Sequence, residues 1–143
     1  MVRPLTAPKL SRVIETCLHV DDVERAASFY QGVLGLAPMA GDTRFRAFDV
    51  GGASVLLLFR RGGTSQPVRL AGGIVPPHGG DGPLHVAFAI ASDELTDWER
   101  RLEEHGVAIE SRVNWSAGGR SVYFRDPDNH LLELATPGLW PNY

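Results

Sequence analysis

Three side chains of this sequence, His85, Glu15 and Glu133, have the chemistry to hold a divalent metal ion. Imidazole and carboxylate groups bind Mn²⁺, Fe²⁺, Ni²⁺, Zn²⁺ or Mg²⁺, and two carboxylates would neutralise the charge of the ion. Three protein ligands would also leave coordination positions for water or a small substrate. Because the three residues are far apart along the chain, the elements that carry them decide whether they meet.

His85 lies in a segment, 83-PLHVAFAI-90, whose alternation predicts a strand. Val86, Phe88 and Ile90 point to one face, and the imidazole shares the other face with two alanines. A face lined by alanine leaves room for a ligand beside the histidine. A hydrogen-bonded structural histidine is the alternative role for this residue.

Glu15 stands at the equivalent point of an earlier predicted strand, 12–20. A helix-capping residue follows seven positions later in both places, Asp22 after Glu15 and Ser92 after His85, so the chain contains one unit twice. Cys17 and His19 share the strand face of Glu15 and are candidate substrate-binding residues. Four residues of strand span about 13 Å, so Glu15 and His19 do not bind the same ion.

This repeat predicts an α+β fold of two βαβββ modules in one chain of 143 residues, with a curled mixed sheet around a pocket. Each module has a strand, a capped helix closed by glycine and three further strands. The connector carries seven glycines and three prolines, which predicts irregular structure that could also cover a pocket. We expect one domain, 1–143, made of module 1 at about 12–59, a connector at 60–82, module 2 at about 83–137 and a tail at 138–143.

Glu133 is a charged residue inside the otherwise apolar strand 131-LLELA-135 and is a candidate catalytic residue as well as a ligand. A carboxylate on such a strand needs a cation, a hydrogen-bond partner or water, because burying it unpaired costs several kcal/mol. An ion pair with Arg120 or Arg125 is the alternative to metal binding.

Three further residues are candidates for contact with a substrate. Tyr123 is a second candidate catalytic residue that could donate a hydrogen bond to the substrate, or it could be a packed aromatic side chain. Trp115 and Arg120 flank the turn at 116–119 and could lie at the mouth of a pocket.

Composition excludes several other functions. The net charge is −3 and no basic run is longer than two residues, so the sequence offers no basic cluster that could bind the phosphates of a nucleic acid. No apolar run approaches the roughly 20 residues that cross a bilayer, so no membrane partner is expected. The single cysteine, Cys17, excludes an internal disulfide, and we expect a cytoplasmic protein.

The motifs of the chain resemble those of the vicinal oxygen chelate superfamily, which includes glyoxalase I, extradiol dioxygenases, fosfomycin-resistance thiol transferases and bleomycin-resistance proteins. This resemblance covers roughly residues 12–137 and implies paired modules whose sheets enclose a metal. It places Glu15 at a first-strand ligand position that is often histidine in relatives, His85 at its counterpart in the second module and Glu133 at the last-strand glutamate. The matching residues are Glu15, Asp22-Val23-Glu24-Arg25, Phe29-Tyr30, Val33-Leu34-Gly35-Leu36, Leu84-His85-Val86, Tyr123-Phe124, Asp126-Pro127-Asp128-Asn129 and Glu133-Leu134.

The chain departs from glyoxalase I at two points. Leu56 and Leu57 occupy the region where that enzyme has a fourth ligand, and His19 replaces an arginine that contacts glutathione. A C-terminal arginine expected of a fosfomycin binder is also missing from the tail. The resemblance therefore favours a three-ligand site like that of the fosfomycin enzymes or dioxygenases.

We expect a metalloenzyme that binds a small oxygen-bearing substrate, with lyase, isomerase, transferase and dioxygenase chemistry all left open. A metal-free dimer that binds an antibiotic or metabolite, as bleomycin-resistance proteins do, is the alternative. The repeat also predicts a homodimer in which Glu15 of one subunit joins His85 and Glu133 of the other.

Overall fold

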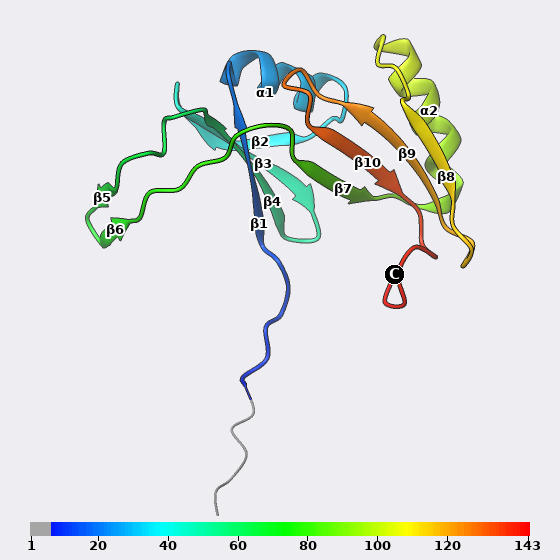
Figure 1. The fold of residues 1–143 in the computed structure, drawn as a ribbon, viewed down its shortest axis with the longest axis horizontal. Helices are drawn as coiled ribbons and strands as arrows, with labels where there is room; N and C mark the ends of the chain where they lie inside the picture. Colours follow the sequence, from blue (N-terminus) through cyan, green and yellow to red (C-terminus); the bar gives the residue numbers. More distant parts are fainter. Residues whose placement is uncertain (1–6) are drawn as a thin grey trace, which may run out of the picture.

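The structure, a computed structural model, describes residues 7–143, and its first half forms one βαβββ module (Figure 1). The sheet order is β1-β4-β3-β2, with β1 parallel to β4 and the other pairs antiparallel. Asp22 caps the helix by accepting a hydrogen bond from the backbone N–H of Arg25. The elements are β1 (Glu15–Val20), α1 (Val23–Gly32), β2 (Ala37–Gly41), β3 (Phe45–Gly51) and β4 (Ser54–Arg60).

The second half repeats this arrangement, which confirms the predicted α+β fold of two modules. Its sheet order is β7-β10-β9-β8, and β7 is again parallel to the last strand of its module. A short 3-10 turn, η1 (Ser92–Glu94), precedes the helix at the predicted capping position. The remaining elements are β7 (His85–Ala89), α2 (Leu95–Glu104), β8 (Ser111–Asn114), β9 (Arg120–Arg125) and β10 (Leu131–Ala135).

The connector is more regular than its composition predicts. It contains a hairpin of β5 (Val68–Leu70) and β6 (Gly73–Val75), which projects away from the two sheets (Figure 1). Gly73 has a φ of 149°, which a glycine adopts without strain at this tight turn. Two prolines and the lack of any period predict a loosely held arm at 1–11, which lies partly outside the described residues, and residues 7–14 form no helix or strand.

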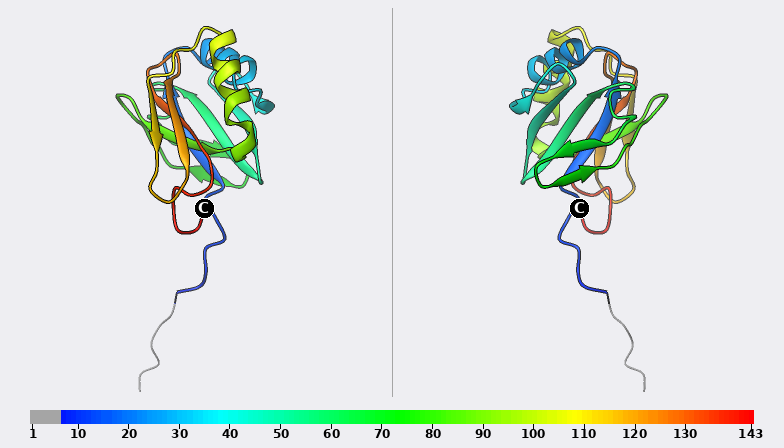
Figure 2. Two further views of the ribbon diagram at one scale, coloured as in Figure 1. Left: turned by 90° about the vertical axis from the view of Figure 1, so that its right-hand side faces the viewer. Right: turned by 90° about the vertical axis from the view of Figure 1, so that its left-hand side faces the viewer.

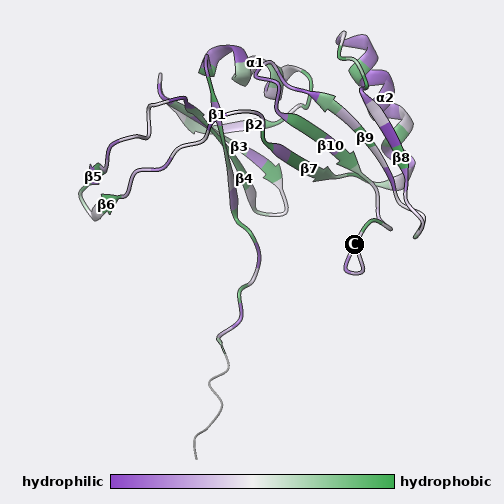
Figure 3. Cartoon of the chain, in the orientation of Figure 1, coloured by the Kyte–Doolittle hydropathy of each residue, from purple (hydrophilic) through white to green (hydrophobic). Residues whose placement is uncertain are grey.

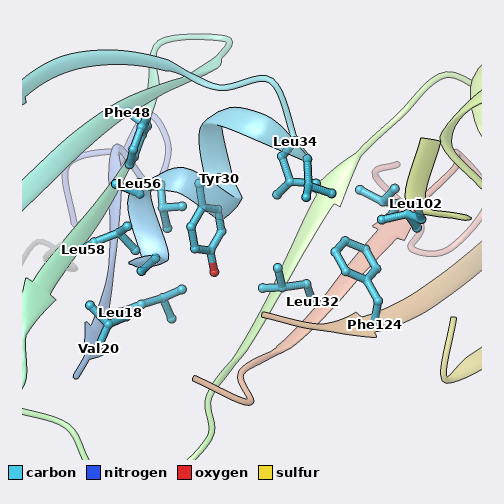
Figure 4. Packing of buried hydrophobic residues seen from close by; sticks show 14 of the residues in the cluster. Leu18, Val20, Tyr30, Leu34, Phe48, Leu56, Leu58, Leu102, Phe124 and Leu132 are labelled. Carbon is cyan, nitrogen blue, oxygen red and sulfur yellow. The ribbon is translucent and has the colours of Figure 1, made fainter. Parts of the chain in front are cut away.

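A core of apolar side chains lies between the two sheets (Figure 4). It combines the inner faces of β1, β4, β9 and β10 with residues of both helices, including Tyr30, Leu34 and Leu102. Figure 2 shows the sheets splayed apart, with the helices gathered near one end, and in Figure 3 β10 is largely hydrophobic. Because side chains alternate along a strand, the opposite face of each sheet points away from this core.

Polar contacts also join the modules. The Tyr30 hydroxyl donates to Oδ2 of the Asp126 carboxylate at 2.6 Å, and both residues are buried. His130 Nε2 donates to the backbone carbonyl of His19, while its Nδ1 accepts from the backbone N–H of Leu84. These contacts tie the end of β1 to the start of β7 and of β10. Within the described residues, no helix is long and apolar enough to cross a membrane.

Candidate metal centre

His85, Glu133, Tyr123 and Ser121 lie on the outward face of the second sheet. Glu133 is directly opposite Tyr123 in the pairing of β10 with β9, and the intervening residues of these strands point into the core. Glu133 is only 4% exposed although it faces away from the core. The side chains around it therefore remove most of its contact with water.

Two of the three predicted ligands meet. His85 Nε2 lies 3.2 Å from Glu133 Oε1. The other ring nitrogen, Nδ1, lies 2.9 Å from the backbone oxygen of Leu131, which can only accept, so Nδ1 carries a proton. In the neutral ring, Nε2 therefore presents a lone pair to a carboxylate oxygen. Such a contact needs a proton or a metal ion between the two atoms.

The donor pair fits a divalent metal ion. Two donors at bond lengths of about 2.1 Å on one ion are about 3 Å apart when they occupy neighbouring positions. The 3.2 Å between Nε2 and Oε1 matches this separation. The bond from Nδ1 to the Leu131 carbonyl also fixes the ring and its tautomer, as partners of metal-bound histidines do.

Ser121 holds the second oxygen of Glu133, a role that the sequence analysis missed. Its hydroxyl donates to Glu133 Oε2 at 2.5 Å and accepts from the Trp115 indole N–H at 2.8 Å. The signal in the sequence was a serine two residues before Tyr123 on a strand whose alternate residues are apolar. Trp115 therefore reaches the centre through Ser121, and its neighbour on the turn, Arg120, follows the alternation of Val122 onto the other face.

Tyr123 stacks on the imidazole, with the ring centres 6.2 Å apart and the planes at 30°. Burial, followed by the negative charge of Glu133 and a hydrogen bond to it, raises the pKa of Tyr123. The phenol therefore keeps its proton at neutral pH and remains a hydrogen-bond donor. The predicted alternative for Glu133, an ion pair with Arg125, is not formed, because Arg125 pairs with Glu110.

Glu15 lies on the outward face of the first sheet, at the exposed start of β1. Within residues 7–143, no third histidine, cysteine, aspartate or glutamate joins His85 and Glu133 in a group that could hold a metal. The single chain therefore does not bring Glu15 to the pair. Cys17 is half-buried beside it, and burial together with the charge of Glu15 raises the pKa of the thiol.

His19 is buried under the connector at the other end of the same strand face. Its Nε2 lies 3.3 Å from Thr64 Oγ1, and the Thr64 hydroxyl donates to the backbone oxygen of His78 at 2.5 Å. The ring stacks on Phe59 and contacts His78 edge to face, and its Nδ1 is buried without a partner. Burial and the nearby groups His78, Arg61 and His130 lower the pKa of His19.

A cavity of about 740 Å³ lies beside this centre. It opens between the modules and is lined by residues such as Thr16, Val55, Phe88 and Trp98. His85, Glu133 and Tyr123 do not border it. Among the described residues, its lining includes no histidine or cysteine and a single carboxylate, Asp49, so we assign the metal site to the outward-facing pair of His85 and Glu133.

Comparison with known proteins identifies the family of the chain. A sequence profile described as Glyoxalase/Bleomycin resistance protein/Dioxygenase superfamily matches residues 12–134. The chain belongs to this superfamily. The match spans both modules and ends just beyond Glu133.

Relatives in the superfamily include enzymes named for thiol chemistry. The chain is 30% identical to metallothiol transferase FosB of Shouchella clausii, over 84% of this chain and 76% of that protein. It is 33% identical to glutathione transferase FosA of Serratia marcescens, over 85% and 78%. A crystal structure of lactoylglutathione lyase from Agrobacterium tumefaciens superposes with a TM-score of 0.85 at 30% identity, covering 94% of this chain and 99% of that one.

Proposed function

We propose that this superfamily member is a metalloenzyme in which Glu15, His85 and Glu133 hold a divalent ion that binds a small oxygen-bearing substrate. The observation that carries the proposal is His85 Nε2 facing the buried carboxylate of Glu133 at 3.2 Å, while Nδ1 is held by the Leu131 carbonyl. When bound, the ion supplies Lewis-acid chemistry by withdrawing charge from a substrate oxygen.

The protein residues have distinct roles in this proposal. Ser121 holds Glu133 Oε2, so that Oε1 remains directed toward His85. Tyr123 keeps its proton and donates a hydrogen bond to a substrate oxygen beside the imidazole. The names of the relatives, metallothiol transferase and lactoylglutathione lyase, support transfer or lyase chemistry on a small molecule.

The third ligand comes from a second copy of the chain. Glu15 and the His85–Glu133 pair lie on outward faces of different sheets, so each chain offers one half of a site to a partner. We infer a homodimer with two shared sites. Mixing Glu15→Ala and Glu133→Ala subunits tests this arrangement, because a mixed dimer then contains one intact site and one doubly broken site. Sites confined to single chains would all stay broken.

Metal analysis tests the proposed function directly. Protein purified without added metal, then dialysed against one divalent ion at a time, should retain about one ion per chain by elemental analysis. Glu133→Ala should lose it, whereas Glu110→Ala, which removes a carboxylate paired with Arg125, should not. If neither the parent protein nor any variant retains stoichiometric metal, the metalloenzyme proposal is wrong and the metal-free binding dimer is favoured.

A further inference from the structure

We propose that the substrate carries a flat apolar body and no phosphonate or other anionic group beyond the metal, a conclusion that rests on the proposed metal site. Two faces would enclose the substrate, one beside the metal pair and one on the partner, and two nearby arginines already pair with carboxylates.

The face beside the metal pair is made of alanines and aromatic rings. Ala87 lies opposite Glu133, and Ala89 lies opposite Ala135, in the pairing of β7 with β10. Ala87 and Ala89 are exposed, because the residues that alternate with them pack into the core. The rings of Tyr123 and Trp115 border this floor through their contacts with His85 and Ser121. Such a surface accepts a flat apolar group by stacking and burial.

The facing surface, supplied by β1, β3 and β4 of the partner, is also apolar. Cys17 and Ala47 both lie opposite Leu57, on the face away from the core. The charged side chains described on this face are carboxylates, Glu15 and Asp49. An anionic substrate group would meet repulsion there.

Two arginines that lie near these faces, Arg125 and Arg61, are already paired. Arg125, on the face of Tyr123, donates to both carboxylate oxygens of Glu110 and to the backbone oxygen of Asn129. Arg61, near the buried end of β1, donates to Asp21 and Asp81. Binding a phosphonate dianion favours a free guanidinium or ammonium group, because its hydrogen bonds are charge-assisted and a guanidinium can donate two of them in parallel. Using either arginine would first break its present pairs.

The far end of the partner's face is closed by the connector. Thr64, His78 and Gly80 cover His19, about 13 Å along the strand from Glu15. The groups there are a neutral imidazole and the Phe59 ring. A substrate held by its oxygens at the metal would therefore extend its apolar body from the alanine floor toward this aromatic end.

Three chelating probes test the substrate class on the Mn²⁺-loaded dimer. Acetohydroxamate and benzohydroxamate present the same two oxygens with a methyl or a phenyl group, and phosphonoformate presents oxygens with a phosphonate. Calorimetric titration should show benzohydroxamate binding at least about tenfold more tightly than acetohydroxamate, because only the phenyl ring buries apolar area. Phosphonoformate should bind no more tightly than acetohydroxamate.

Two substitutions of Ala89 test whether the charge of this floor determines which probe binds. Ala89→Arg places a cation on the floor and should tighten phosphonoformate at least tenfold while weakening benzohydroxamate. Ala89→Met is the matched uncharged control and should weaken benzohydroxamate alone. If a variant does not fold, the three probes on the parent protein still decide.

The outcomes separate this inference from the metal proposal. Phosphonoformate binding as tightly as benzohydroxamate, or equal binding of the two hydroxamates, would overturn the substrate class and leave the metal site standing. So would stoichiometric Mn²⁺ with no hydroxamate binding. Failure to retain Mn²⁺ at all would overturn both.

Discussion

Ser121→Ala should weaken metal binding without unfolding the protein. The serine hydroxyl is the donor to Glu133 Oε2 at 2.5 Å, and both side chains are buried. Without it, one oxygen of a buried carboxylate has no partner, and the carboxylate is free to turn away from His85. Metal binding must then fix the orientation of the Glu133 carboxylate again, which lowers the affinity for the ion.

The size of this effect can be estimated in two ways. A hydrogen bond to a charged group contributes about 1.5–3 kcal/mol. At about 1.4 kcal/mol per factor of ten, this corresponds to roughly 10- to 100-fold in the metal dissociation constant. Losses of this size are typical when a residue that orients a metal ligand is removed. We therefore expect a dissociation constant about 10 to 100 times larger than that of the parent.

Competition with a fluorescent chelator at pH 7.5 measures this dissociation constant, and circular dichroism checks that the variant is folded. Trp115→Phe is the matched control. It keeps an aromatic ring and the Ser121–Glu133 hydrogen bond but removes the indole N–H, so its effect should stay below about tenfold. If Ser121→Ala binds metal within twofold of the parent while Glu133→Ala does not bind it, Ser121 does not orient the metal ligand.

Three predictions concern stability. Tyr30→Phe should lower the free energy of unfolding in urea by about 2 kcal/mol, because Asp126 loses a buried donor, whereas Tyr143→Phe, at a half-exposed hydroxyl, should cost about 1 kcal/mol or less. Burial and Asp126 raise the pKa of Tyr30 well above 10.0, so the folded state binds this proton more tightly. Stability should be complete below pH 10 and fall above it, and Tyr30→Phe should flatten that fall in urea titrations between pH 9 and 11. The lowered pKa of His19 has the opposite sign: its contribution is complete above the ordinary value of 6.5 and is lost at lower pH. His19→Gln should show a smaller loss of stability from pH 7 to pH 5 than the parent, and an equal loss would contradict the assignment.

The repeat could be predicted because each module has the same three sequence features. These are a strand of alternating residues, a helix-capping residue and a glycine that closes the helix. Strand ends were less predictable, because they depend on partners. The first strand was expected at 12–20 but begins at Glu15, since Glu15 already pairs with Val55 near the start of β4. The sequence after the helix-closing Gly106 predicts a strand at 107–113, but β8 spans Ser111–Asn114, which is the part that faces β9.

The hairpin in the connector was not predicted from the sequence, for a different reason. Its strands have three residues each, too few to show a period, and glycines and prolines surround them. Pairing of Val68 with Val75 across the Gly72–Gly73 turn makes the hairpin, and composition alone does not reveal that pairing.

The chemistry was predictable at the level of residue type but not of assembly. Alternation places His85 and Glu133 on one face of neighbouring strands, and the pairing of β7 with β10 then brings them within 3.2 Å. The same alternation gives Glu15 an outward face on the other sheet, but it does not say which faces meet. Both sheets turn their apolar faces inward around α1 and α2, so their functional faces point away from each other. A chain folded in this way separates its own ligands, and the proposed homodimer would return a carboxylate to the pair. Metal affinity should therefore fall when the protein is diluted below the dissociation constant of its dimer, a dependence that a site within one chain would not show.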